Sequence, residues 1–176
     1  MAADFAGVLE RAVDQDDRAF ANLWRAHQPA LIRYFRVVAS NEADDLASET
    51  WMRVARGLHR FHGDESAFRA WLFTIARHTL IDHGRATRRR PAELHREVPD
   101  RGVDDTASTA EEQWSTDAAL ALIARLPSEQ AEVVMLRSVA GLCVEDVARI
   151  LGKRPGTVRV LSHRGLTRLR ELTARP

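Results

Sequence analysis

The sequence of 176 residues has one cysteine, no long hydrophobic run and no glycine-rich phosphate loop. The single cysteine, Cys143, excludes an internal disulfide and fits a reducing compartment. No apolar run approaches the ~20 residues that a membrane-spanning helix needs, so we expect no membrane association. The N-terminus, MAADFAGVLERAVDQDD, carries acids early and lacks the apolar core of a secretion signal. These absences predict a cytoplasmic location.

Patterns for catalysis and metal binding are also missing. The histidines are scattered, and none forms a zinc pattern with the lone cysteine. We therefore expect no metal, no cofactor and no catalytic residue, which means that the protein is not an enzyme. A metal-dependent hydrolase using His59, His62 and Asp64 stays open as an alternative, and metal analysis of the purified protein would test it.

The apolar residues, 45 % of the chain, recur mainly at helical spacing, and no strand-like alternation persists. The net charge of +1 hides a strong segregation of charge. Basic residues cluster at 85–90 and 149–170, and acids cluster at 42–49 and 93–112. A balanced total therefore does not argue against nucleic-acid binding. The sequence predicts an all-α protein of two small helical lobes joined by a flexible acidic linker, with a helix-turn-helix in the C-terminal lobe.

The first predicted lobe, 1–90, contains three helices with apolar stripes. Pro29 is expected to kink or interrupt the first helix, and Asn41 to cap the second. Asp64 or Ser66 should begin the third, which runs into a basic cluster.

The predicted linker, 91–113, has no apolar period and holds seven acids against two arginines. Fully extended, it could span about 70 Å at ~3.3 Å per residue. The second predicted lobe, 114–176, contains four helices, in which Ser128 can cap one helix and Gly141 can end it.

A helix-turn-helix is predicted at 144–166, VEDVARILGKRPGTVRVLSHRGL. Ala148, Gly152 and Val158 lie at the spacing that the motif needs: a small packing residue, a helix-ending glycine and an inward anchor. The second helix is strongly basic. The alternatives are an ordinary helical hairpin with a glycine cap and a stand-alone helix-turn-helix regulator, which would bind DNA as a dimer without any further protein.

Three segments, EADDLASETWMRVARGL (42–58), FRAWLFTIARHTLIDHGRATRRR (68–90) and LPSEQAEVVMLRSVAGLCVEDVARILGKRPGTVRV (126–160), resemble the sigma-70 family. The size and two-lobe order resemble its extracytoplasmic-function (ECF) class. The resemblance implies a factor that binds bacterial core RNA polymerase, through the clamp of the largest subunit and the flap of the second subunit. It also implies promoter DNA as a partner, with the first lobe melting the −10 element and the second reading the −35 element. Whether an anti-sigma factor holds the protein inactive stays open.

The resemblance implies three sets of site residues. Acidic and apolar side chains of one helix would bind the core polymerase: Asp44, Asp45, Leu46, Glu49 and Trp51. A loop and the helix after it would capture an unstacked base and hold phosphates of the −10 element: Phe61, His62, Asp64, Ser66, Arg69, Arg77, His78, Arg85, Arg88 and Arg89. The recognition helix would contact the −35 element: Arg154, Thr157, Arg159, Leu161, Ser162, His163 and Arg164.

Several positions depart from the family pattern. Cys143 stands where a serine or threonine usually caps the helix before the turn, and we expect it to cap poorly. Arg154 stands at the usual serine cap of the recognition helix, followed by Pro155 at a suitable first helical position. His78 replaces a usual asparagine. These departures fall where bases would be read, so the sequence does not define the promoter.

Overall fold

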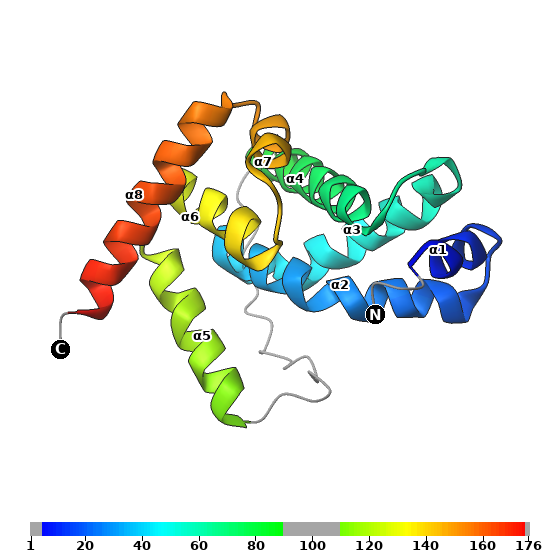
Figure 1. The fold of residues 1–176 in the computed structure, drawn as a ribbon, viewed down its shortest axis with the longest axis horizontal. Coiled ribbons are helices and arrows are strands. Elements are labelled where there is room, and N and C mark those ends of the chain that lie inside the picture. The colour runs from blue at the N-terminus through cyan, green and yellow to red at the C-terminus, as the bar shows by residue number, and fades with distance from the viewer. Residues whose placement is uncertain (1–4, 90–109, 175–176) are drawn as a thin grey trace.

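The structure, a computed structural model, describes residues 5–89 and 110–174, and every regular element in these ranges is a helix. The first lobe is formed by α1 (Phe5–Val13), α2 (Asp17–Val38), α3 (Ala43–Gly57) and α4 (Glu65–Arg89). The second is formed by α5 (Ala110–Ala124), α6 (Ser128–Val134), a π-helical turn η4 (Met135–Val139), α7 (Val144–Leu151) and α8 (Pro155–Thr173). Figure 1 shows α8 at the end opposite α1. The predicted all-α, two-lobe fold is confirmed.

The expected linker falls mostly on 91–109, which lies outside the described residues. Its last part is helical, because α5 begins at Ala110 rather than near Trp114.

The first lobe includes a helix, α1, that the sequence analysis does not predict. Helix α1 packs along α2 and buries Leu9 and Ala12. The turn after it leads to Asp16, whose Oδ1 accepts the backbone N–H groups of Arg18 at 2.8 Å and Ala19 at 3.3 Å. This cap fixes the start of α2, the helix against which α1 and α3 pack.

Two local features of the first lobe differ from expectation. Pro29 does not interrupt α2, because a proline removes only one helical hydrogen bond and buried side chains on both sides, including Leu23 and Leu31, hold the helix to the core. Asn41 does not cap α3. It lies inside a 3₁₀ turn, Ser40–Glu42, and no side chain caps that helix.

The expected start of α4 is confirmed, since Asp64 Oδ1 accepts the N–H of Ala67 at 2.8 Å. In the second lobe Ser128 does not cap α6; it is the first helical residue, and Pro127 occupies the cap position. Gly141 does end the following π-helical turn, with a φ of +66°.

The recognition helix packs on α6 at a glycine. A Cβ built on Gly165 would lie 2.8 Å from Cγ2 of the buried Val134. We expect Gly165→Ala to destabilise the protein by up to about 2 kcal/mol, because overpacking costs ~1–3 kcal/mol and alanine gains about 1 kcal/mol of helix propensity. Urea unfolding measures this change. Gly84→Ala is the control, because nothing lies within 4 Å of a Cβ there, and it should stabilise; equal effects of the two changes would contradict the close packing.

Candidate polymerase- and DNA-binding surfaces

The turn between α7 and α8 has the predicted geometry. Gly152 adopts φ +62° and ψ +33°, and the N–H groups of Lys153 and Gly152 bond back to the carbonyls of Ala148 at 2.9 Å and Arg149 at 3.4 Å. Pro155 occupies the first turn of α8. Val158 is fully buried, as expected of the inward anchor.

Cys143 caps α7, contrary to the expectation that it caps poorly. Its sulfur accepts the N–H of Asp146 at 3.4 Å, and its thiol donates to Asp146 Oδ2 at 3.1 Å. This reciprocal pair resembles a capping box, in which a side chain three residues into the helix completes the cap.

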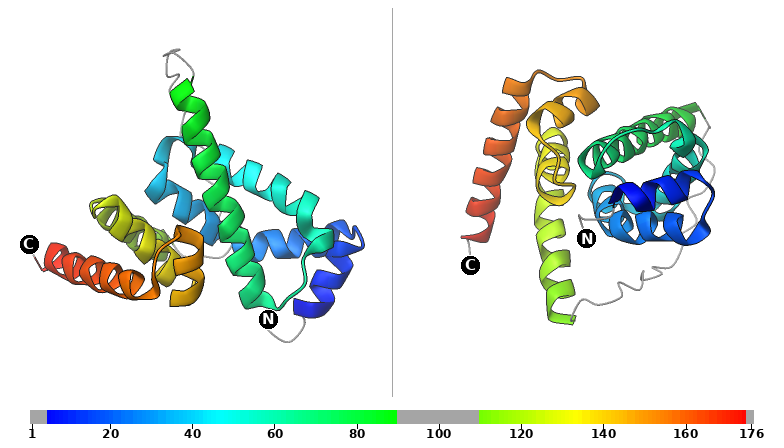
Figure 2. Two further views of the ribbon diagram at one scale, coloured as in Figure 1. Left: turned by 90° about the horizontal axis from the view of Figure 1, so that it is seen from above. Right: turned by 45° about the vertical axis from the view of Figure 1, so that its right-hand side comes forward.

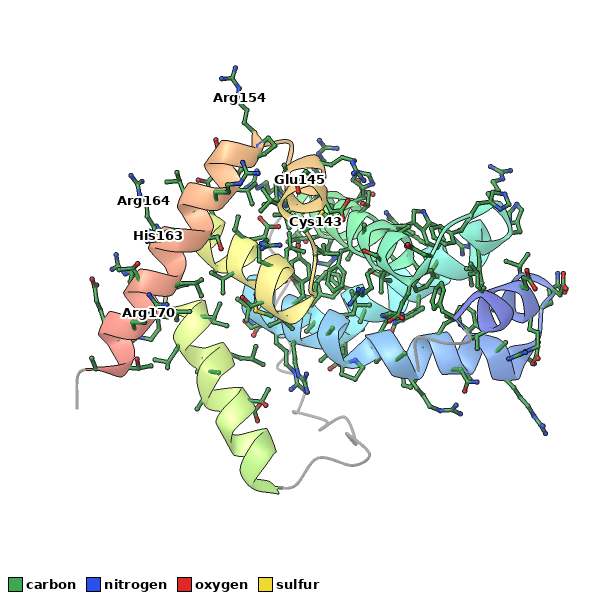
Figure 3. The ribbon with its side chains drawn as sticks, viewed as in Figure 1. Cys143, Glu145, Arg154, His163, Arg164 and Arg170 are labelled. Carbon is green, nitrogen blue, oxygen red and sulfur yellow. The ribbon has the colours of Figure 1, made fainter. Side chains whose placement is uncertain are left out.

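The outer face of α8 differs from the expected set at its centre. Leu161 is half-buried and packs against the core, and Ser162 is also half-buried, because both lie on the side of α8 that carries Val158. Val160 takes the outer position and is 48 % exposed. Five of the expected residues are exposed: Arg154, Thr157, Arg159, His163 and Arg164. Figure 3 shows the side chains of Arg154 and Arg164 pointing away from the other helices.

Arg159 has a partner that the sequence did not indicate. Its Nη2 lies 3.2 Å from Oε1 of Glu145 on α7, and both side chains are about 60 % exposed. An exposed pair of this kind contributes about 0–1 kcal/mol, so the guanidinium can exchange the carboxylate for another acceptor at little cost.

The acidic helix α3 presents its carboxylates but not its apolar residues. Asp44 and Asp45 are exposed, whereas Leu46 and Trp51 are buried in the core. The expectation that Leu46 and Trp51 line a docking surface is therefore wrong. On α3 it is instead the apolar side chain of Met52 that is exposed, to 52 %.

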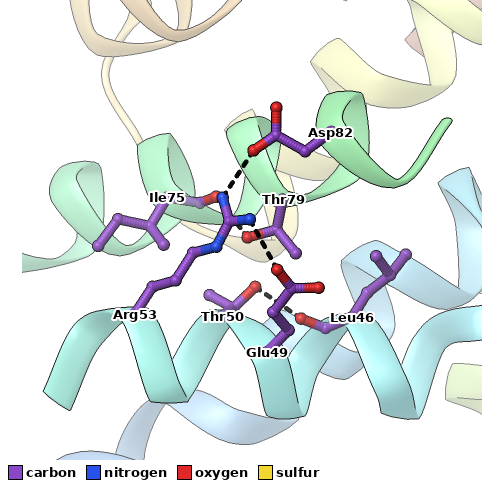
Figure 4. Close-up of polar contacts among 7 residues, drawn as sticks. All are labelled: Leu46, Glu49, Thr50, Arg53, Ile75, Thr79 and Asp82. Atoms are coloured by element: carbon purple, nitrogen blue, oxygen red, sulfur yellow. Dashed lines mark hydrogen bonds and ion pairs between the residues drawn. The ribbon is translucent and has the colours of Figure 1, made fainter. Parts of the chain in front are cut away.

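Glu49 belongs to an internal contact between α3 and α4. Arg53 lies between the two helices, with Nη2 2.6 Å from Glu49 and Nη1 2.9 Å from Asp82 (Figure 4). Hydrogen bonding to Asp82 and Glu49 raises the pKa of the Arg53 guanidinium. Glu49 thus helps to position the Arg53 side chain, whose pair with Asp82 joins the two helices.

The loop before α4 does not leave Phe61 free to stack on a base. Phe61 is half-buried and stacks on Trp71, with ring centroids 5.0 Å apart and an interplanar angle of 27°, and it meets Phe68 edge-on at 5.6 Å. His62, Asp64 and Ser66 are exposed, as expected. Phe61 supports the loop rather than protruding from it.

The basic residues expected along α4 fall into two groups. His78, Arg85 and Arg88 are exposed, and the side chain of Arg89 lies outside the described part of the chain. Arg69 and Arg77 are half-buried against the second lobe. The Nη1 of Arg69 lies 3.3 Å from a Cβ built on Gly141, and Nε of Arg77 lies 3.1 Å from Oε1 of Glu132.

Within the described ranges, no three histidine, cysteine, aspartate or glutamate side chains are grouped to hold a metal ion, and His59, His62 and Asp64 form no such group. In the same ranges, no helix is both long enough and apolar enough to cross a membrane.

Glu132 is the most unusual acid in the described structure. Burial raises the pKa of its carboxyl above the ordinary 4.5 and outweighs the lowering by Arg77, Tyr34 and Lys153, while Glu129 raises it further. Burial also raises the pKa of Tyr34, whose hydroxyl donates to Glu132 Oε1 at 2.9 Å.

This raised pKa predicts a pH-dependent stability. The folded chain binds the Glu132 proton more tightly than the unfolded chain does, so this contribution is fully present below pH 4.5 and is lost as pH rises through the folded pKa. We expect the melting temperature of the wild type to rise relative to that of Glu132→Gln as pH is lowered from about 7 to about 5. A difference that stays constant with pH would contradict this interpretation.

Two helical lobes, one of which carries a helix-turn-helix with a basic second helix, are typical of a DNA-binding protein. The models of sigma-70 region 2 and sigma-70 region 4 match residues 23–90 and 116–169. The ECF RNA polymerase sigma factor ShbA of Streptomyces griseus is 36 % identical in an alignment that covers 94 % of this chain and 93 % of the relative. The ECF sigma factor SigD of Mycobacterium tuberculosis is 32 % identical, over 93 % of this chain and 81 % of its own. The chain belongs to the ECF class of the sigma-70 family.

Solved structures agree with the fold. CnrH, in complex with the cytosolic domain of CnrY, superposes with a TM-score of 0.61 at 21 % identity, over 94 % of both chains. RpoE from Bartonella quintana, in complex with the anti-sigma factor NepR, has a TM-score of 0.61 at 24 % identity, over 89 % of this chain and 98 % of its own.

Proposed function

We propose that this chain binds bacterial core RNA polymerase and directs it to specific promoters, at which transcription begins. The observation that carries the proposal is that sigma-70 region 2 and region 4 both match this chain, in that order, and that a sigma-factor relative aligns with it over 93 % of the relative's length. The protein itself catalyses no reaction: it positions core RNA polymerase at the promoter and opens the DNA by binding to it. Since its partner is the polymerase, it acts in the cytoplasm.

The first lobe, 1–90, docks on the polymerase clamp through the exposed carboxylates of Asp44 and Asp45, beside the exposed Met52. Charge complementarity steers the encounter, and the thioether supplies apolar contact. The flap contact belongs to the second lobe, 114–176.

The −10 element meets the loop residues His62, Asp64 and Ser66 and the exposed arginines of α4. The −35 element meets the outer face of α8, where Arg159 reads bases and Arg164 holds phosphates. The support for this division is position: Arg159 lies in the first turns of the recognition helix, beside the buried Val158, and Arg164 lies farther along.

Relatives in solved complexes with anti-sigma factors, such as the RpoE that binds NepR, make an anti-sigma factor a further candidate partner.

The proposal is tested by the dependence of DNA binding on polymerase. Purified chain, core enzyme and both together are titrated onto labelled genomic promoter fragments in a gel-shift assay. We expect a specific complex only when both proteins are present. Tight, specific binding by the chain alone as a dimer would instead support the stand-alone regulator.

A further inference from the structure

One apolar side chain lies on the outer face of α8, among basic residues. Val160 is 48 % exposed, whereas Val158, two residues earlier, is fully buried. Since successive residues of a helix are turned by about 100°, the two valines point in nearly opposite directions. Both views in Figure 2 show α8 at the edge of the molecule, with the other helices on one side of it. Val160 therefore faces away from α6 and α7, the helices on which α8 packs.

The fold itself gives no reason for a valine at this position. The side chain of Leu161, the next residue, packs against the hydrophobic core, and that of Val160 does not. Valine is also a weaker helix former than alanine, because its branched side chain is restricted in a helix. A single exposed valine is common on protein surfaces, so it is the surroundings of Val160 that indicate a ligand.

The side chains around Val160 are basic or polar. Arg159 precedes it, and His163 and Arg164 lie one turn farther along the same face; all three are exposed. The exposed Thr157 lies one turn before it. No acidic residue occurs in 147–170. A face of this kind is complementary to the phosphates that line a groove of DNA, whereas an apolar protein partner would have to bury the charges at a cost.

The major groove of DNA offers a valine one kind of contact. The groups that distinguish the bases there are hydrogen-bond donors and acceptors, with the exception of the C5-methyl group of thymine. Val160 lies in the second turn of α8, which begins at Pro155, and residues near the start of a recognition helix contact base edges. Because a valine side chain has no hydrogen-bonding group, it can distinguish base pairs in this groove only through the methyl group.

We propose that Val160 is a specificity-determining residue that contacts the methyl group of a thymine in the −35 element. This inference rests on the proposed function, in which α8 contacts that element. Adjacent Cα atoms are ~3.8 Å apart and successive base pairs ~3.4 Å apart, so the thymine lies within about two base pairs of the guanine that Arg159 reads. Burial of one methyl-sized group changes the affinity about fourfold.

The proposal is tested on DNA that the protein itself selects. The complex of the full chain with core RNA polymerase selects binding sequences from a pool of double-stranded DNA of random sequence. Each thymine of the selected −35 element, on either strand, is then replaced by deoxyuracil, which lacks only the methyl group. Competition in a gel-shift assay measures the affinity of the complex for each DNA. We expect a loss of about fourfold at one thymine.

Three variants show which side chain makes this contact. Val160→Ala, whose side chain is too short to reach the base, should bind the thymine and deoxyuracil forms equally, and Val160→Ile should keep the preference. Leu166→Ala is the matched control, because Leu166 is also an exposed apolar residue of α8, 39 % exposed, and lies farther along the helix. It should keep the fourfold preference. In urea unfolding Val160→Ala should be at least as stable as the wild type, which separates a DNA contact from a role in folding.

A selected −35 element without thymine would overturn the proposal. So would a preference for thymine over deoxyuracil that persists in Val160→Ala, or an absence of any preference in the wild type. Weaker binding of Val160→Ala to core enzyme in the absence of DNA would assign the side chain to a protein contact instead.

The proposed function fails in a different way. Selection of the same sequences by the chain without core enzyme would count against the proposed function alone, and the methyl comparison would then be made with that complex. If no sequence were selected with or without core enzyme, both the proposed function and the thymine contact would be contradicted.

Discussion

Reversing both carboxylates at the start of α3, Asp44→Arg with Asp45→Arg, is expected to lower the affinity for core RNA polymerase by about ten- to hundredfold, or ~1.4–2.7 kcal/mol. The two side chains are exposed and have no assigned internal role, so the loss reports on the partner. Titration of labelled chain with core enzyme by fluorescence anisotropy measures it. Asparagine at both positions removes the charge at nearly constant size and should give an intermediate loss.

Glu49 is left unchanged in this variant. It is also an acid of α3, but it pairs with Arg53, so reversing its charge would disturb the Arg53 contact between α3 and α4. Glu10→Arg with Asp14→Arg is the matched control, because it makes the same charge change on exposed residues of the first lobe. Since acids in a first helical turn also stabilise the helix, circular dichroism must show intact folding. If the folded double variant of Asp44 and Asp45 bound core polymerase as tightly as the wild type, these carboxylates would have no role in docking.

Arg159→Ala is expected to relax the preference among −35 sequences by about 1–3 kcal/mol at one position while keeping binding to core enzyme. An exposed arginine early in a recognition helix can bond bidentately to guanine, and its pair with Glu145 is too exposed to hold it back. Competition between −35 variants for the polymerase complex measures the preference.

Arg164→Ala provides the contrast. A phosphate contact carries no sequence information, so its loss should weaken all −35 sequences alike and lower the salt slope by about one. Arg170→Ala, near the far end of α8, should change neither quantity (Figure 3). If Arg159→Ala weakened every sequence equally, base reading would move to Thr157 or the exposed Val160, because Leu161 and Ser162 face the core side.

The helix-turn-helix could be predicted from the sequence because its determinants are local. A glycine in a left-handed conformation, a proline in the first helical turn and a buried valine each act within a few residues. Which side chains lie on the outer face of α8 was harder to predict. The sequence analysis placed Leu161 on that face, and the structure places Val160 there.

Which apolar side chains are buried was harder to predict than where the helices lie. Leu46, Trp51 and Phe61 are apolar residues beside charged ones, and the sequence alone does not show whether such a residue faces a partner or its own core. The apolar spacing of Phe5, Val8, Leu9 and Ala12 would have indicated α1. No local pattern could have paired Tyr34 with Glu132, which lie 98 positions apart.

The most direct test of the account is run-off transcription with purified bacterial core RNA polymerase on fragments of genomic DNA. Core enzyme with this chain should initiate at discrete sites that share −35 and −10 sequences, and core enzyme without the chain should not. The Asp44→Arg, Asp45→Arg variant should lose this activity, and Glu10→Arg with Asp14→Arg should retain it. Transcripts that are identical in the presence and absence of the chain would contradict its assignment as a sigma factor.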